Sequence, residues 1–319
     1  MEAIFPILSL TWFDGAATAC LSSHLMSHKD PDLQPGSVTF DLSLGPVFLR
    51  IVDLPTAWEP FVSTHYEPFA EPAGSRTADL TVTCREGSGV VIPLPGPGKT
   101  PIMEVLQEGR DQYSIRSHWQ HGTVDLAAGS ASLTLTHRGA TEFRMSLENF
   151  LRIAGQLLLM RRKAFLLHSA GVLDEQRCFL FFGHSGAGKS TATALSAPRR
   201  ALSDDMVLID LQGSRVQAHA VPFYGLFPPE ERVRGAFPVA GGFRLRQATG
   251  DRLERLKIAR ATATISASVP FIHDMGLPPD LLTDLALEFC RRVPVYDLQF
   301  TRTNRFWDLL AELPDPTPL

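Results

Sequence analysis

One run of eight residues constrains the fold of this chain more than any other segment: Gly183-His184-Ser185-Gly186-Ala187-Gly188-Lys189-Ser190. It matches the pattern G-x-x-x-x-G-K-[ST], whose glycines allow a tight turn with backbone N–H groups facing phosphate oxygens. In this pattern the lysine reaches the β- and γ-phosphates, and the final hydroxyl can bind Mg²⁺. An apolar strand is predicted at 178–182 and a helix at 190–196, so the helix dipole also faces the anions. The sequence therefore predicts a loop that binds a nucleoside triphosphate.

The residues that we assign to phosphate binding are the loop and the first residues of the helix that follows it. They are Gly183, Ser185, Gly186, Ala187, Gly188, Lys189, Ser190 and Thr191. The cofactors expected at such a site are ATP and Mg²⁺, because a triphosphate site needs a cation and a carboxylate near it.

Two places in the sequence could supply that carboxylate. Asp204-Asp205 precedes the apolar run 206–209, and Asp210 ends it. Which acid approaches the loop depends on the strand direction, which the sequence leaves open. Adjacent acids before a buried strand repel each other unless a cation lies near them, so we favour Asp204 and Asp205. The predicted metal ligands are therefore Ser190, Asp204 and Asp205.

The two halves of the chain differ in their patterns. Residues 1–145 are β-rich, with alternating stretches such as 38–44, 78–84 and 132–136. A helix is predicted to begin at Ser146, with a strand at 165–173 and a second strand entering the loop. Further strands are expected at 206–210, 216–223 and 295–300, and helices at 252–266, 280–292 and 306–313. We therefore expect an α/β domain at 146–319 behind a smaller β-rich domain at 1–145.

The bulk composition excludes several classes of protein. The 319 residues are 44% hydrophobic with a formal net charge of −4, which gives no argument for binding nucleic acid or an anionic membrane. The four cysteines lie far apart, so a disulfide framework or a zinc site is not expected. The most apolar run, 157–160, is too short to span a bilayer. We expect a protein of the cytoplasm without a signal peptide.

Three blocks of sequence resemble the HPr kinase/phosphorylase family and, more distantly, the ATP-dependent phosphoenolpyruvate carboxykinases. They are the strand Leu167-His168-Ser169-Ala170-Gly171-Val172, the Gly-rich loop, and Leu202-Ser203-Asp204-Asp205-Met206-Val207. Asp204 follows Lys189 by only 15 residues, a short gap that is typical of this subgroup. Residues 149–152 and 220–225 also resemble segments of HPr-kinase-like proteins found near peptide-modification gene clusters.

This resemblance implies a carboxykinase-type P-loop kinase core in which the strand before the loop belongs to a hairpin. It also implies an ATP- and Mg²⁺-dependent kinase that phosphorylates a serine-type hydroxyl. The acceptor would be a peptide, a protein or a small molecule, which residues 1–145 would help to bind. The resemblance leaves a homo-oligomer open. Family members carry Asp after the first glycine of the loop, where this chain has His184.

Four residues are candidates for the catalytic work. His168 could touch the phosphates or the acceptor, or be a hydrogen-bonded core histidine. His184 could accept a proton through its imidazole, or fill a solvent-facing position. Asp205 could act as base, metal ligand or both. Arg234 could neutralise the γ-phosphate, or belong to a solvated charge run at 230–234. Arg244 and Arg246 are weaker candidates, and His219 and Tyr224 could line the acceptor pocket.

Two other functions compete with a kinase. A nucleotide-binding ATPase or regulator of peptide modification would hydrolyse ATP without an acceptor. A carboxykinase would need a longer chain and further metal-binding blocks, which are absent from the sequence.

Overall fold

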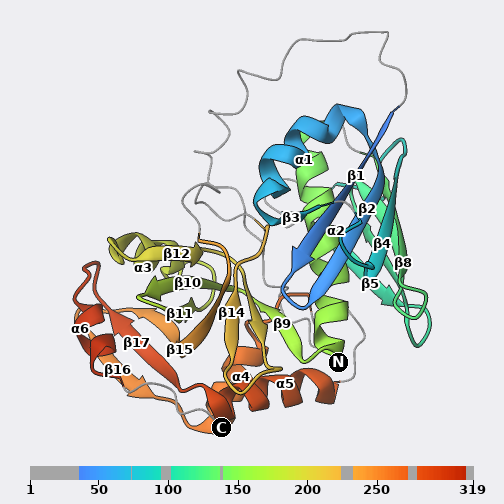
Figure 1. Cartoon of the computed structure of the whole chain (residues 1–319). Helices are drawn as coiled ribbons and strands as arrows, with labels where there is room; N and C mark the ends of the chain where they lie inside the picture. Colours follow the sequence, from blue (N-terminus) through green and yellow to red (C-terminus); the bar gives the residue numbers. More distant parts are fainter. Residues whose placement is uncertain are drawn as a thin grey trace.

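Two mixed β-sheets with a long helix between them form the body of the molecule (Figure 1). The computed structural model describes residues 36–72, 74–94, 102–136, 139–223, 233–271 and 279–313. The mixture of strands and helices confirms the predicted α/β class.

The first sheet contains eight strands in the order β3-β1-β2-β4-β8-β7-β6-β5. The strands predicted at 38–44, 78–84 and 132–136 correspond to β1, β4 and β8. Burial alternates along strands such as β8, so one face of the sheet is packed against the core and the other faces solvent. Two short helices, η2 and η3, flank α1 after the second strand. The bounds are β1 (Ser37–Leu44), β2 (Val47–Pro55), η2 (Thr56–Trp58), α1 (Glu59–Tyr66), η3 (Glu67–Phe69), β3 (Ala70–Glu71), β4 (Leu80–Glu86), β5 (Met103–Gln107), β6 (Gln112–Ser117), β7 (Gln120–Asp125) and β8 (Ser130–Leu135).

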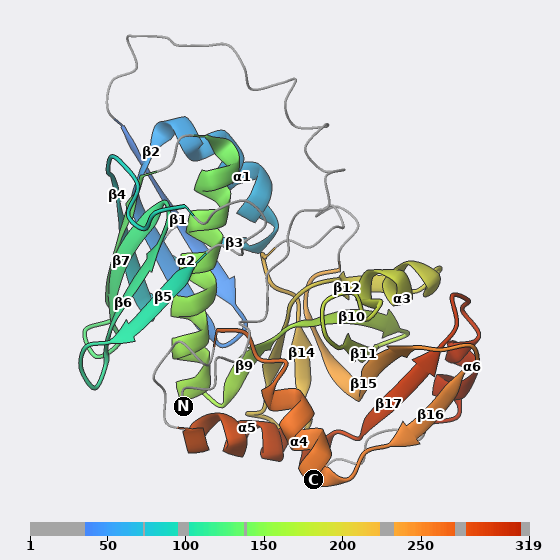
Figure 2. The same ribbon diagram turned by 180° about the vertical axis from the view of Figure 1, so that it is seen from behind.

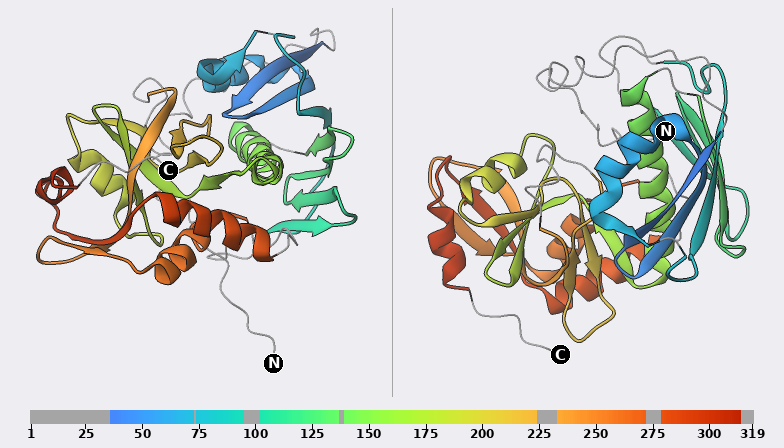
Figure 3. Two further views of the ribbon diagram at one scale, coloured as in Figure 1. Left: turned by 60° about the horizontal axis from the view of Figure 1, so that its bottom comes forward. Right: turned by 45° about the horizontal axis from the view of Figure 1, so that its top comes forward.

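The long helix α2 (Ala140–Arg161) lies in the curve of the first sheet, as the view along its axis shows (Figure 3, left). All of its residues from Ser146 to Met160 except Asn149 are buried, which is typical of a helix packed on all sides. The predicted start at Ser146 is wrong, because the helix begins six residues earlier, after an extended Gly139. No helix in the described part of the chain is long and apolar enough to cross a membrane.

The second sheet has nine strands, seven of them in the order β12-β10-β11-β15-β14-β13-β9. The long strand β15 pairs with β14 along its first residues and with β11 and β17 farther on. The last strand of the chain, β17, also pairs with β16. The bounds are β9 (Ala164–Leu167), β10 (Ser169–Asp174), β11 (Arg177–Phe182), β12 (Arg200–Ser203), β13 (Val207–Asp210), β14 (Gln217–His219), β15 (Ala236–Gln247), β16 (Arg252–Arg255) and β17 (Val295–Phe300).

Helices cover both faces of the second sheet (Figure 2). Side chains of β11 alternate between two cores: Leu180 and Phe182 join the core that contains α4 (Ile258–Ser266) and α5 (Pro279–Arg292), while Phe179 and Phe181 join the core of α3 (Lys189–Leu195) and α6 (Phe306–Ala311). A strand that is buried on both faces reads as a continuous apolar run. This burial on both faces explains why the strand before the loop could be predicted from its apolar sequence.

Three predicted elements differ in the structure. The single strand at 165–173 is two strands, because the backbone N–H of His168 donates to the Ser268 carbonyl (2.8 Å) and β9 and β10 pair with different neighbours. The helix at 252–266 begins only at Ile258, since β16 pairs with β17. The strand at 216–223 is confined to Gln217–His219.

Gly122 in β7 lies where the first sheet packs against α2, and a side chain there would have no room. A Cβ atom there would lie 2.3 Å from the Ser132 carbonyl oxygen and 2.6 Å from the Phe150 ring. Because backbone cannot yield as a flexible side chain can, we expect Gly122→Ala to lower the free energy of unfolding by about 1–3 kcal/mol. Urea denaturation measures this, with Gly250→Ala as the matched control, since Gly250 has no atom within 4 Å of such a Cβ. Equal stabilities of the two variants would contradict this packing.

Candidate functional site

The Gly-rich loop, the acid pair and His168 meet at one edge of the second sheet. β10 begins directly after His168 and runs antiparallel to β11, starting opposite Phe182, where the loop begins. β12 pairs with the other side of β10 and ends at Ser203, so the chain enters Asp204 at the same edge. The hairpin of β10 and β11 therefore brings together three segments that are separate in the sequence.

Strand direction also separates the two candidate acids. Val207, the first residue of β13, lies opposite Leu167, next to His168. Asp210 lies at the other end of the strand, opposite Ala164. The structure thus places Asp204 and Asp205, and not Asp210, at the edge where the loop lies.

The loop 183–190 has the backbone that its glycines permit. Gly188 has φ +107°, a left-handed conformation that side chains rarely adopt, and a Cβ on it would lie 2.8 Å from the Phe300 ring. Within the turn, the Ala187 N–H donates to the His184 carbonyl (3.0 Å). The Lys189 ammonium folds back and donates to the Gly183 carbonyl (3.3 Å). Ser190 and Thr191 follow in the first turn of α3, while Ser185 and Gly186 are exposed.

The two adjacent acids are buried beside this lysine. Asp204 is 3% exposed and Asp205 is 7% exposed. The hydroxyl of Ser203 fixes their turn, since it accepts hydrogen bonds from the N–H groups of Asp205 (3.3 Å) and Met206 (3.1 Å). Burial lowers the pKa of Lys189, and the charges of Asp205 and Asp204 partly offset this effect. Lysine and acids therefore share one electrostatic site.

A residue that was not predicted, Arg152, joins the acid pair from α2. Its Nη2 lies 4.0 Å from Asp205 Oδ2 and 3.4 Å from Glu148 Oε2. His65 of α1 in turn donates from Nε2 to Glu148 Oε1 (2.8 Å). We call His65, Glu148, Arg152 and Asp205 the buried charge chain, since each is under a tenth exposed. The spacing of Glu148 and Arg152, four residues apart in an apolar helix, was the available signal.

The buried charge chain makes stability depend on pH. Burial raises the pKa of Glu148, but the Arg152 charge and the His65 hydrogen bond outweigh it and leave this pKa below 4.5. An acid whose pKa is lower in the folded state than in the unfolded state stabilises the fold at pH values above its unfolded pKa. This stabilisation is lost as the pH falls through the folded pKa. We therefore expect the free energy of unfolding to decline below about pH 4.5, and less steeply in Glu148→Gln. Urea denaturation from pH 7 to pH 3 tests this, and parallel curves would contradict it.

His168 faces the acid pair as a neutral ring. Its Nε2 lies 3.7 Å from Asp205 Oδ1. Burial first, and then the charges of Lys189 and Arg152, lower the pKa of His168 to about 3. At neutral pH this imidazole therefore carries no charge that could neutralise phosphate.

The other predicted residues are not part of the buried cluster around Asp205. His184 is exposed on the loop, with Nδ1 2.6 Å from the Ser185 carbonyl oxygen, and its proposed part in proton transfer stays a prediction. Arg234 is exposed and donates to the Pro68 carbonyl.

The weaker candidates also lie away from the acid pair. Arg244 pairs with Asp297, and Arg246 lies 3.8 Å from the same carboxylate. His219 lies 3.7 Å from Asp210, the acid away from the loop, and Tyr224 is outside the described residues.

The acid pair and the loop have the donor types that Mg²⁺ takes beside a nucleotide. Among the described residues, no group of three or more His, Cys, Asp or Glu side chains is arranged to hold a metal by itself. Mg²⁺ at a phosphate site needs only one or two carboxylates, with phosphate and water oxygens completing its shell. Asp204, Asp205 and the Ser190 hydroxyl fit that requirement, and an added cation would reduce the repulsion between the two acids.

Comparisons with known proteins add one family. A family model described as "SynChlorMet cassette protein ScmC" matches residues 145–313. No curated protein matches the chain. Among solved structures, the chain is similar to the HPr(Ser) kinase/phosphatase from Coxiella burnetii, with 10% identity and a TM-score of 0.25, over 46% of this chain and 91% of that chain. The range matched by the family model contains every site residue described above except His65.

Proposed function

We propose that this chain, which belongs to the SynChlorMet cassette protein ScmC family, is an ATP- and Mg²⁺-dependent kinase that phosphorylates a serine-type hydroxyl. One observation carries the proposal: the Gly-rich loop with Lys189 and the buried pair Asp204-Asp205 meet at one sheet edge. Phosphoryl transfer consists mostly of positioning and charge neutralisation, and these residues supply both. The fold that we propose for residues 146–319 is the carboxykinase-type P-loop core.

Each residue has a defined part in this proposal. The backbone of 183–190 and the Lys189 side chain hold the phosphates of ATP. Thr191, which follows Ser190 in α3, is also assigned to phosphate binding. Ser190, Asp204 and Asp205 would hold Mg²⁺, which neutralises charge on the phosphate oxygens when it is bound. His168 is a positioning residue, since its neutral ring faces Asp205.

The transfer itself breaks one bond and forms one. The acceptor oxygen bonds to the γ-phosphorus of ATP, the bond from that phosphorus to the β,γ-bridging oxygen breaks, and ADP leaves. The hydroxyl proton passes to the Asp205 carboxylate, in the way that an aspartate accepts this proton in protein kinases. Arg152 Nη2, 4.0 Å from Asp205 Oδ2, would help to orient this carboxylate.

Residues 1–145 are proposed to recognise the acceptor, for which a precursor peptide encoded in the same gene cassette is our first candidate. The support is physical: the buried charge chain connects α1, through His65, to Asp205. Binding of a peptide against α1 therefore has a direct route to the acid at the reacting oxygen.

Transfer of label from [γ-³²P]ATP tests the proposal. The purified chain is incubated with Mg²⁺ and either the cassette peptides or small hydroxyl compounds. We expect acid-stable, alkali-labile label on serine, which is absent with EDTA. Release of labelled phosphate without any labelled acceptor would contradict the kinase and support an ATPase or regulator.

A further inference from the structure

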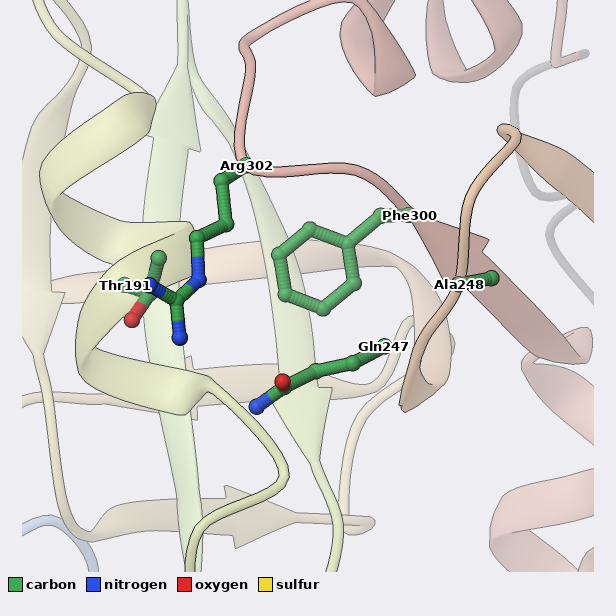
Figure 4. Close-up of a pocket in the computed structure, with 5 residues that line it drawn as sticks. All are labelled: Thr191, Gln247, Ala248, Phe300 and Arg302. Atoms are coloured by element: carbon green, nitrogen blue, oxygen red, sulfur yellow. The ribbon is translucent and has the colours of Figure 1, made fainter.

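A small pocket opens on the side of the loop away from the acid pair's strands, at the ends of β15 and β17. It measures about 120 Å³ and is lined by Thr191, Gln247, Ala248, Phe300 and Arg302. Figure 4 shows Gln247, Phe300 and Arg302 around one space, with the Arg302 guanidinium reaching toward Thr191. None of these residues except Thr191 has a part in the proposed transfer.

The directions of the neighbouring strands explain why a ligand could bind at this position. β15 runs parallel to β11 on one side and to β17 on the other. The loop follows the carboxyl end of β11, and Gln247 and Phe300 are the last residues of β15 and β17. Ligands of open α/β sheets bind outside the carboxyl ends of parallel strands. The pocket and the loop therefore occupy neighbouring parts of one such edge.

Direct contacts join the pocket walls to the loop. The Gln247 side chain donates from Nε2 to the Gly186 carbonyl (2.9 Å). The Phe300 ring packs so close to Gly188 that no Cβ fits between them. Thr191 follows Ser190 directly. A molecule whose phosphates lie on the loop would thus have its other end within reach of the pocket.

The chemistry of the pocket suits a flat, aromatic ligand with polar edges. The Phe300 ring, which is 2% exposed, forms an apolar part of the pocket wall. The exposed Arg302 makes no ion pair within the described residues and can lie over the ring of a ligand. The side-chain oxygen of Gln247 can accept a hydrogen bond from an amino group. Pockets that enclose a whole ligand measure about 300–1,000 Å³, so this one would hold only a fragment.

We infer that this pocket binds the base of a purine nucleoside triphosphate whose phosphates occupy 183–190. The inference rests on the proposed function, because it requires the loop to bind phosphates. It adds residues that select a nucleotide over a bare polyphosphate: Gln247, Phe300 and Arg302.

Calorimetric titration with two ligands, MgATP and Mg-tripolyphosphate, tests the inference. Ala248→Trp fills the pocket, and Arg302→Gln removes its cation, while Arg305→Gln is a control for an exposed arginine in the same turn that does not line the pocket. We expect wild type to bind ATP more tightly than tripolyphosphate. Arg302→Gln should weaken ATP by about three- to tenfold, and Ala248→Trp should remove the preference, with tripolyphosphate unchanged in both.

The outcomes separate the two proposals. If wild type binds neither ligand, the proposed function fails and the pocket's assignment fails with it. If wild type binds both but Ala248→Trp still prefers ATP, or if Arg302→Gln weakens both ligands equally, the loop stands and the base pocket is overturned.

Discussion

Replacing Lys189 by alanine is expected to reduce phosphoryl transfer by about 10²–10³-fold, since removing one preorganised donor from a developing anion typically has that effect. The ammonium is held at the loop by the Gly183 carbonyl and by the charges of Asp204 and Asp205. Without this ammonium, the γ-phosphate would lie near two carboxylates with one positive charge fewer to offset the repulsion between them. The measurement is the rate of label transfer at saturating ATP, together with ATP affinity.

Lys257→Ala is the matched control for this prediction. Lys257 is exposed before α4 and lies outside the site, so its replacement should leave the rate unchanged. Far-ultraviolet circular dichroism should show that both variants are folded. Equal rates for wild type and Lys189→Ala would remove the loop from the chemistry.

Replacing Arg152 by methionine is expected to lower the free energy of unfolding by about 3–5 kcal/mol, the usual cost of breaking a buried ion pair by removing one partner. Glu148 and Asp205 would both remain buried near the lost cation. The double variant Glu148→Gln with Arg152→Met should recover part of the loss, because it removes one of the stranded charges. Urea denaturation measures all three.

Arg161→Met provides the comparison within the same helix. Arg161 pairs with Asp111, but its side chain is 40% exposed, and exposed pairs contribute only about 0–1 kcal/mol. Arg152→Lys, which keeps the charge, serves if the methionine variant does not fold. Should Arg152→Met be as stable as Arg161→Met, the buried charge chain would have no structural importance.

The residues of the site differ in how far the sequence could reveal them. The loop, the strand before it and the acid pair were predictable because each depends on a local pattern. The sequence favoured Asp204-Asp205 over Asp210 on charge repulsion alone and left the strand direction open, since no local pattern specifies the pairing of β13 with β9 that places the pair beside the loop. Contacts between residues far apart in the sequence decide in which direction a strand such as β13 runs, and these contacts exist only in the folded chain.

Arg152 shows the same limit in the helix. Most helices of globular proteins are buried on one side only, so the sequence pattern alone gave no reason to expect a charged residue such as Arg152 in the interior. α2 is instead enclosed by the first sheet and by β9, which makes a charged position an interior one. Similarly, the break at His168 depends on the Ser268 carbonyl, 100 residues away in the sequence.

The central claim is that the loop and the acid pair bind Mg²⁺ and a triphosphate together, and ATP titration with and without Mg²⁺ tests it most directly. The account predicts one site per chain in wild type, with an affinity that falls when EDTA is added. In Asp204→Asn the dependence on Mg²⁺ should be lost, and in Lys189→Ala the binding itself. ATP binding of equal strength in all these samples, or no binding to wild type, would contradict it.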